Sequence, residues 1–214
     1  MEDAKWRAGS LEERVVRHCA PTLAGIKCGS MFMMRSAKDE VLGDVRRLNR
    51  ETSGLGVIAL VLKAGDDGAL VYVYRPGMLS EVLSDRRVRS FLEGLGYRDG
   101  SAPSLIRTLS ERFGRERMPH EVGIFLGYPL EDVVGFIEKG GRGCSRSGCW
   151  KCYGDPARAE AMFERCKDCS ARCSRIYMEG GSLGSLCARP AKARHRLFIR
   201  HTRIGMAIAW TLKC

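Results

Sequence analysis

The spacing of apolar and polar residues along the chain predicts short helices and strands in turn. Continuous apolar runs at 57–62 and 70–74 are typical of buried strands, and the Gly-Asp-Asp-Gly stretch at 65–68 predicts a hairpin between them. In chain order we expect a helix from residue 10, a strand at 28–34, a helix from 36, the two hairpin strands, helices within 77–97 and from 101, a strand at 122–126, a helix at 130–137, a cysteine loop, and a helix from 155 to 180. The predicted fold class is α/β of the mixed α+β kind, with a mixed sheet of about four strands flanked by helices and a Cys-rich loop and helix near the C-terminus.

The run from Pro119 to Asp155 is the stretch around which we expect the rest of the chain to be organised. The apolar segment at 122–126 reaches a Gly-Tyr-Pro turn at 127–129, and an amphipathic helix follows. Glu131 and Asp132 fall at the N-terminal end of this helix, where the helix dipole favours acidic side chains. The cysteine loop comes directly afterwards, so a site in that loop would lie beside this run.

The composition is that of a folded domain. With 214 residues, of which 44% are hydrophobic, the chain is long enough to bury a core without disulfides. We expect one α/β domain over 1–182, with a Cys-rich subregion at 142–178, and a basic extension over 183–214 that need not be rigid. No apolar run approaches the roughly 20 residues that span a bilayer, and the chain opens with acidic residues, so we expect no transmembrane segment and no signal peptide. A cytoplasmic location follows, in which cysteines stay reduced.

The net charge of +11 is concentrated at the C-terminal end. Residues 189–214 hold seven basic and no acidic residues, which accounts for +7 of the +11. Such a tail can bind the phosphate backbone of a nucleic acid or an anionic membrane surface. The alternative is a loosely packed extension without a binding role, since no aromatic stacking platform accompanies the charges.

Ten cysteines supply the clearest candidate chemistry. Cys149 and Cys152 form one C-x-x-C pair, and Cys166 and Cys169 form a second, which is the pattern of a zinc ribbon. A helix that starts at Asp155 favours another interpretation, because its cysteines would then project within an arc of about 60° and form a core stripe. Buried cysteine behaves as a small hydrophobic residue, so the helical cysteines can serve packing alone.

The cysteine loop has less reason to hold thiols for packing. Its glycines leave few apolar neighbours, and Arg146 and Lys151 would lower thiol pKa values. Metal binding and redox chemistry are both compatible with this loop, and so is the absence of either. If a metal is bound, zinc or iron is expected, with ligands drawn from Cys144, Cys149, Cys152 and Cys169.

A second candidate set pairs His18 and Cys19 with His120 and Glu121. Imidazole, thiol and carboxylate groups can bind a cofactor, or act as a nucleophile and its base, if the fold brings the two segments together. The alternative is that both histidines are structural residues held by hydrogen bonds.

Several long motifs resemble a known family. They are His-Cys-Ala-Pro-Thr-Leu-Ala-Gly-Ile-Lys at 18–27, Val-Tyr-Val-Tyr-Arg-Pro at 71–76, His-Glu-Val-Gly-Ile-Phe-Leu-Gly-Tyr-Pro-Leu-Glu-Asp at 120–132 and Trp-Lys-Cys-Tyr-Gly-Asp at 150–155. The chain is similar, over about residues 10–180, to bacterial domain of unknown function family 3793, whose members come mostly from anaerobes. The resemblance implies a single domain and suggests flavodoxin and iron-transport components as partners, but it implies no catalytic residue. Cys152 and Cys166 stand where the family pattern leads us to expect an aliphatic and an aromatic residue.

Three functions therefore stay open. The first is a cytosolic accessory protein of iron- or flavodoxin-linked metabolism that binds a metal or a redox cofactor. The second is a nucleic-acid-binding module that uses residues 189–214. The third is a thiol-dependent enzyme with Cys19 or Cys149 as nucleophile.

Overall fold

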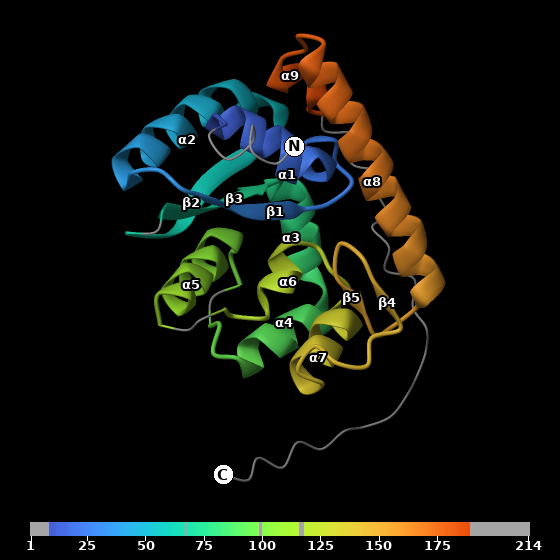
Figure 1. Cartoon of the computed structure of the whole chain (residues 1–214). Helices are drawn as coiled ribbons and strands as arrows, with labels where there is room; N and C mark the ends of the chain where they lie inside the picture. Colours follow the sequence, from blue (N-terminus) through green and yellow to red (C-terminus); the bar gives the residue numbers. More distant parts are fainter. Residues whose placement is uncertain (1–8, 67, 99, 116–117, 189–214) are drawn as a thin grey trace.

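A computed structural model describes residues 9–66, 68–98, 100–115 and 118–188 (Figure 1). In chain order its elements are α1 (Leu11–Leu23), β1 (Gly29–Met34), α2 (Lys38–Thr52), the short 3-10 helix η1 (Ser53–Leu55), β2 (Ile58–Gly65), β3 (Gly68–Tyr74), α3 (Pro76–Ser84), α4 (Arg86–Gly94), α5 (Ala102–Arg115), α6 (Val122–Phe125), α7 (Leu130–Glu138), β4 (Arg146–Ser147), β5 (Lys151–Cys152), α8 (Pro156–Met178) and α9 (Leu183–Leu186). This confirms the predicted mixed α+β class. No helix among these residues is long and apolar enough to cross a membrane.

The main sheet has the strand order β1-β3-β2, and both pairings are antiparallel. β3 is the central strand, and helices cover both of its faces, which explains its continuous apolar sequence. Val71 and Val73 point into a core beneath α1 and α2, whereas Leu70 and Tyr72 point into a second core formed with α3 to α6. Figure 1 shows these two helical layers above and below the sheet.

The strand predicted at 122–126 is wrong, because residues 122–125 form helix α6. The main sheet consequently has three strands, all antiparallel, rather than about four in a mixed arrangement. All five residues from Val122 to Leu126 are buried, so no polar position reveals the period of the segment. A short apolar run of this kind cannot be assigned to a strand or a helix by its pattern alone.

The predicted domain boundary at residue 182 falls inside a packed part of the structure. Leu183 and Leu186 of α9 are buried in the core beneath α1 and α2. Arg75 is buried and donates hydrogen bonds to the carbonyl oxygens of Thr22, Leu23 and Ala188, which joins the end of α1 to the chain after α9. We therefore propose that the domain extends to residue 188.

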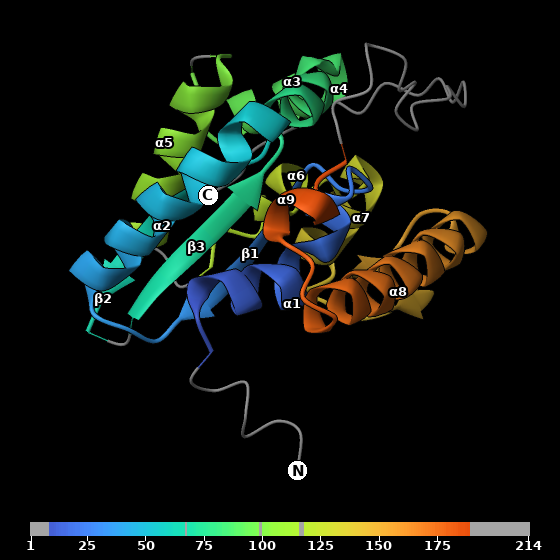
Figure 2. The same cartoon turned by 90° about the horizontal axis from the view of Figure 1, so that it is seen from above.

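Helix α8 begins where the sequence predicts. Asp155 caps it by accepting hydrogen bonds from the backbone N–H groups of Ala157 and Arg158, at 3.0 and 3.2 Å, and Pro156 occupies its first position. The helix packs along α1 and lies at one side of the molecule (Figures 1 and 2). It is this packing that brings its cysteines towards the cysteine loop.

Candidate functional site

A buried carboxylate fixes the cysteine loop to α7. Asp132 is 3% exposed and accepts three hydrogen bonds: from the indole N–H of Trp150 at 2.7 Å, and from the backbone N–H groups of Tyr153 and Gly154 at 2.6 and 2.8 Å. Hydrogen bonds to a carboxylate are stronger than those between neutral groups, so this one side chain holds the residues on both sides of β5, just ahead of α8. The sequence placed Asp132 at a helix N-terminus but gave no sign of its partners.

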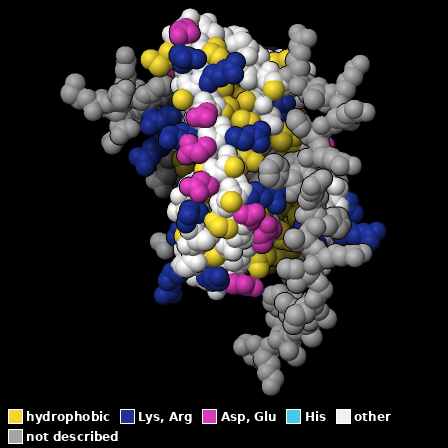
Figure 3. Space-filling model, turned by 90° about the vertical axis from the view of Figure 1, so that its right-hand side faces the viewer, with side chains coloured by type: hydrophobic (Ala, Val, Ile, Leu, Met, Phe, Trp, Pro, Cys, Tyr) yellow, Lys and Arg dark blue, Asp and Glu magenta, His cyan; other side chains and the backbone are white. Residues whose placement is uncertain are grey.

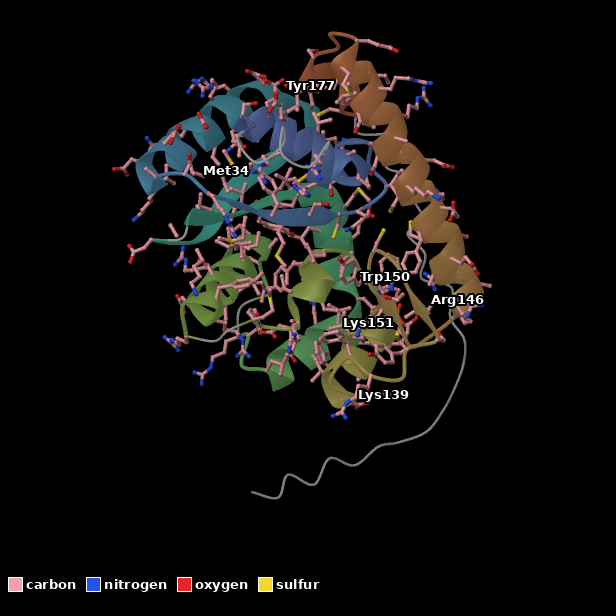
Figure 4. The ribbon with its side chains drawn as sticks, viewed as in Figure 1. Met34, Lys139, Arg146, Trp150, Lys151 and Tyr177 are labelled. Atoms are coloured by element: carbon pink, nitrogen blue, oxygen red, sulfur yellow. The ribbon has the colours of Figure 1, made fainter. Side chains whose placement is uncertain are left out.

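Trp150 fills the space between this loop and its neighbours. Its ring stacks on Tyr128 with a centroid separation of 4.9 Å and meets Phe163 of α8 edge-on at 4.6 Å. Figure 4 shows Trp150 between the β4–β5 ribbon and α8. The hydroxyl of Tyr128 also donates to the carbonyl oxygen of Cys149 at 3.1 Å. The backbone position of Cys149 is therefore fixed by two aromatic side chains.

Cys149 on the loop and Cys166 on α8 act on each other electrostatically, and each is the leading cause of the shift in the other's pKa. Cys149 is exposed, whereas Cys166 is 2% exposed. The hydrogen bond from Cys166 and the positive charge of Lys27 lower the pKa of Cys149 to about 6. The same contact with Cys149, together with burial, raises the pKa of Cys166 well above its ordinary value. Ionisation of the pair is therefore favoured at the exposed Cys149 over the buried Cys166.

The cation beside this pair comes from a distant part of the sequence. Lys27 lies in the turn between α1 and β1, with its Nζ 5.0 Å from the centre of the Tyr128 ring. The prediction that Arg146 and Lys151 would lower the thiol pKa finds no support in their contacts. Arg146 lies 3.6 Å from Glu160, and Lys151 donates to the carbonyl oxygen of Gly141.

A cleft of about 290 Å³ is lined in part by Trp150 and Arg165, the chain neighbours of Cys149 and Cys166. The α1–β1 turn, the turn before α7, Trp150 and the exposed edge of α8 form its walls. Three of the motifs that carry the family resemblance meet here, and they contribute Ile26, Lys27, Gly127, Pro129, Trp150 and Asp155. This convergence makes the cleft, together with the neighbouring cysteine loop, the candidate functional site.

The four predicted metal ligands do not converge. Cys144 is half-buried in the loop, Cys152 is buried in β5, and Cys169 faces its helical neighbour Cys173 with 3.9 Å between the sulfur atoms. Within residues 9–188, apart from the four positions that the structure leaves undescribed, no three His, Cys, Asp or Glu side chains are grouped as a metal site requires. Between the two C-x-x-C pairs, Cys149 and Cys166 each shift the pKa of the other.

The second predicted set is divided by the sheet. His18 stacks on Phe32 at 5.4 Å on the side of α1, and burial, followed by Arg17 and Arg14, lowers its pKa. Cys19 is completely buried beside it, and burial raises its pKa far above the ordinary range.

The other half of that set lies on the opposite side, next to α6. His120 meets Phe136 edge-on at 5.0 Å. Glu121 is buried, accepts a hydrogen bond from the Tyr97 hydroxyl at 3.0 Å, and pairs with Arg112 at 2.5 Å. The structure thus gives Glu121 polar partners on α5 and on the segment after α4, and it does not bring His18 to His120.

Comparison with known proteins gives a family and no further relatives. The predicted nucleic-acid-binding segment, 189–214, lies outside the described residues and outside the matched region. Neither a curated protein nor a solved structure matches the chain. A family model described as "Protein of unknown function (DUF3793)" matches residues 15–187, and the chain therefore belongs to the DUF3793 family.

Proposed function

We propose that this protein is a cytoplasmic thiol-redox accessory protein, with Cys149 as its reacting thiolate and Cys166 as its resolving thiol. What supports the proposal is an exposed thiol on the loop whose pKa is lowered to about 6 and a buried thiol on α8 whose pKa is raised, each being the leading cause of the other's shift. The sequence left open an accessory protein of iron- or flavodoxin-linked metabolism that binds a metal or a redox cofactor. The proposal replaces this with one reaction, thiol–disulfide exchange.

The first step is nucleophilic attack on a disulfide R–S–S–R. The Cys149 thiolate forms a bond with one sulfur of this disulfide, the S–S bond of the substrate breaks, and RS⁻ leaves. Because a thiolate rather than a thiol is the nucleophile, a pKa of about 6 keeps Cys149 reactive at neutral pH.

The second step is resolution by Cys166. Once Cys149 has become a mixed disulfide, it carries no negative charge, and the largest cause of the raised pKa of Cys166 disappears. Cys166 then loses its proton to the departing thiolate or to water, attacks the Cys149 sulfur, and releases the second RS⁻. Two electrons have passed from the cysteines to the substrate disulfide, which leaves as two thiols.

The number of possible metal ligands near Cys149 and Cys166 favours thiol–disulfide exchange over metal binding. Structural zinc needs four ligands and catalytic zinc three, and the described residues around Cys149 and Cys166 supply two sulfurs. A thiol pair needs no third donor.

The test is to equilibrate the reduced protein with glutathione redox buffers, quench with acid, and map disulfides by mass spectrometry. We expect a Cys149–Cys166 disulfide. Cys166→Ser should trap glutathione on Cys149, whereas Cys149→Ser should leave the buried Cys166 unmodified. Cys144→Ser, in the same loop, is the matched control and should keep the disulfide. A Cys149–Cys152 disulfide, or glutathione on Cys144 alone, would contradict the proposal.

A further inference from the structure

A second cavity, of about 380 Å³, is lined by residues of β1, α6, α7 and the β4–β5 loop. Its volume falls in the range of small-molecule sites, which is roughly 300–1,000 Å³. Neither Cys149 nor Cys166 lines it. What this cavity binds is therefore a separate question from the thiol-redox function.

The walls of this cavity are rich in aromatic rings. Tyr128 and Trp150 both line it and stack on each other with a centroid separation of 4.9 Å. His120 and Phe136 also line it and meet edge-on at 5.0 Å. The other large apolar side chains of the lining are Met31, Val122, Leu126 and Val133. Rings that pack against each other in this way present planar, apolar surface, which suits a planar aromatic ligand.

Two polar side chains beside Phe136 can hold an anionic group. The Nζ atom of Lys151 lies 6.0 Å from the centre of the Phe136 ring and donates to the carbonyl oxygen of Gly141. An ammonium group has three N–H donors, so this hydrogen bond uses one of them. The imidazole of His120 supplies a further N–H donor.

The acid among the lining residues is already satisfied. Asp132 is buried and accepts hydrogen bonds from Trp150, Tyr153 and Gly154. Lys27, with its Nζ 5.0 Å from the centre of the Tyr128 ring, adds a second positive charge to this region. An anionic group on a ligand therefore meets attraction here.

The surface around α8 does not select charge in this way. Figure 3 shows acidic and basic side chains mixed over that side of the molecule, so an anion there meets repulsion as well as attraction. Figure 4 shows Lys151 on the same loop as Trp150. A cation and an aromatic wall thus reach the cavity from one short segment.

We propose that this cavity binds a small planar aromatic anion. The ring system of the ligand lies among the side chains of Tyr128, Phe136 and Trp150. Its carboxylate or sulfonate pairs with Lys151 and accepts a hydrogen bond from His120. His120 thereby has a ligand-binding role that does not require His18 or Cys19.

The test uses two fluorescent probes with the same rings. One is the anion 8-anilinonaphthalene-1-sulfonate, and the other is N-phenyl-1-naphthylamine, which lacks the sulfonate. Both are titrated into the full-length reduced protein. Lys151→Glu should weaken binding of the anion about fivefold, the effect of one solvent-accessible ion pair, and leave the neutral probe unchanged. Lys139→Glu makes the same change of charge at an exposed residue that does not line the cavity, and should alter neither affinity.

A second pair of variants tests the aromatic wall. Phe136→Leu keeps an apolar side chain but removes a ring, so both probes should bind roughly fivefold more weakly. Ile137→Leu, at the next position and outside the lining, is its control, and circular dichroism checks that each variant is folded.

Three results would overturn the proposal: no binding of the anionic probe, equal losses in Lys151→Glu and Lys139→Glu, or unchanged affinities in Phe136→Leu. The disulfide between Cys149 and Cys166 is measured separately, so these results leave the thiol-redox function standing. Failure to form that disulfide would in turn leave the aromatic-anion site untouched.

Discussion

The pairs Cys149–Cys166 and Cys169–Cys173 bring two sulfurs together in different ways. The first joins a loop to α8, and the second joins two successive turns of α8, with sulfurs 3.9 Å apart. In the first pair the exposed member has a pKa lowered to about 6. In the second, burial and the neighbouring Cys173 raise the pKa of Cys169 to about 12.

The difference shows that closeness of two thiols does not make one of them reactive. Cys166 and the positive charge of Lys27 both lower the pKa of Cys149. Cys169 is itself half-buried, so desolvation opposes its ionisation, and Arg172 offsets only part of this. A reactive pair thus needs one exposed sulfur, one buried donor and a cation.

The largest expected effect comes from removing Asp132, because the first pair depends on the docked loop and the second depends on α8 alone. Asp132→Ala leaves an indole N–H and two backbone N–H groups without their acceptor, which should lower the free energy of unfolding by on the order of 3 kcal/mol. Alkylation of Cys149 at mildly acidic pH should slow greatly, while that of Cys169 should stay unchanged. Urea unfolding and residue-resolved alkylation measure the two effects.

Two variants control for this result. Glu131→Ala removes an exposed carboxylate from the same helical turn and should alter neither quantity by much. Asp132→Asn keeps one carbonyl oxygen for the backbone N–H groups of Tyr153 and Gly154, and should fall between the wild type and Asp132→Ala. Normal alkylation of Cys149 in Asp132→Ala would show that the loop does not need this carboxylate.

The sequence predicted the parts of this comparison that depend on local spacing. The Asp155 cap and the helical cysteine stripe are both present, with Cys166 and Cys173 buried on α8. The strand expected at 122–126 failed because a fully buried segment shows no alternation.

The site itself depends on contacts that sequence spacing does not contain. Lys27 reaches Cys149 from more than a hundred residues away in sequence, and Asp132 holds a loop some twenty residues further on. Both residues lie in motifs that the sequence singled out, but their neighbours in the fold were not visible there. The sheet, in turn, separates His18 from His120, although both sit in motifs of similar character.

Removing the second sulfur of each pair should change the alkylation rate of the remaining cysteine in opposite directions. Cys149 should react more slowly and Cys169 faster. Cys166→Ala removes the donor to Cys149, raises its pKa and should slow its alkylation at pH near 6.5 by about tenfold, the effect of one hydrogen bond to a charged group. Cys173→Ala removes a neighbour that raises the pKa of Cys169, so alkylation of Cys169 should become faster. Mass spectrometry of timed iodoacetamide reactions gives both rates.

Cys166→Ser tests whether a lost hydrogen-bond donor causes the slower alkylation of Cys149, because serine keeps a hydroxyl donor in the same place. It should restore most of the rate that Cys166→Ala loses. If both variants slow Cys149 equally, the loss comes from disturbed packing of α8 rather than from the missing hydrogen bond.

The smallest expected effect is a pH dependence of stability with opposite sign for the two pairs. The folded-state pKa of Cys149 lies below the ordinary value of 9.0, so its contribution to stability is fully present above pH 9 and is lost as the pH falls through about 6. The folded-state pKa of Cys169 lies above 9.0, so its contribution is fully present below pH 9 and is lost as the pH rises through about 12.

Urea unfolding of reduced Cys149→Ser and Cys169→Ser separates these contributions. Between pH 6 and 9 the stability advantage of the wild type over Cys149→Ser should grow by on the order of 1 kcal/mol, well below the full value of the pKa shift because solvent screens this exposed site. Its advantage over Cys169→Ser should stay constant over that range and shrink above pH 9, since the unfolded chain then gains by ionising a thiol that the folded chain keeps neutral. A pH-independent difference for Cys149→Ser would mean that this thiol ionises equally in both states, and the contrast between the two pairs would then be lost.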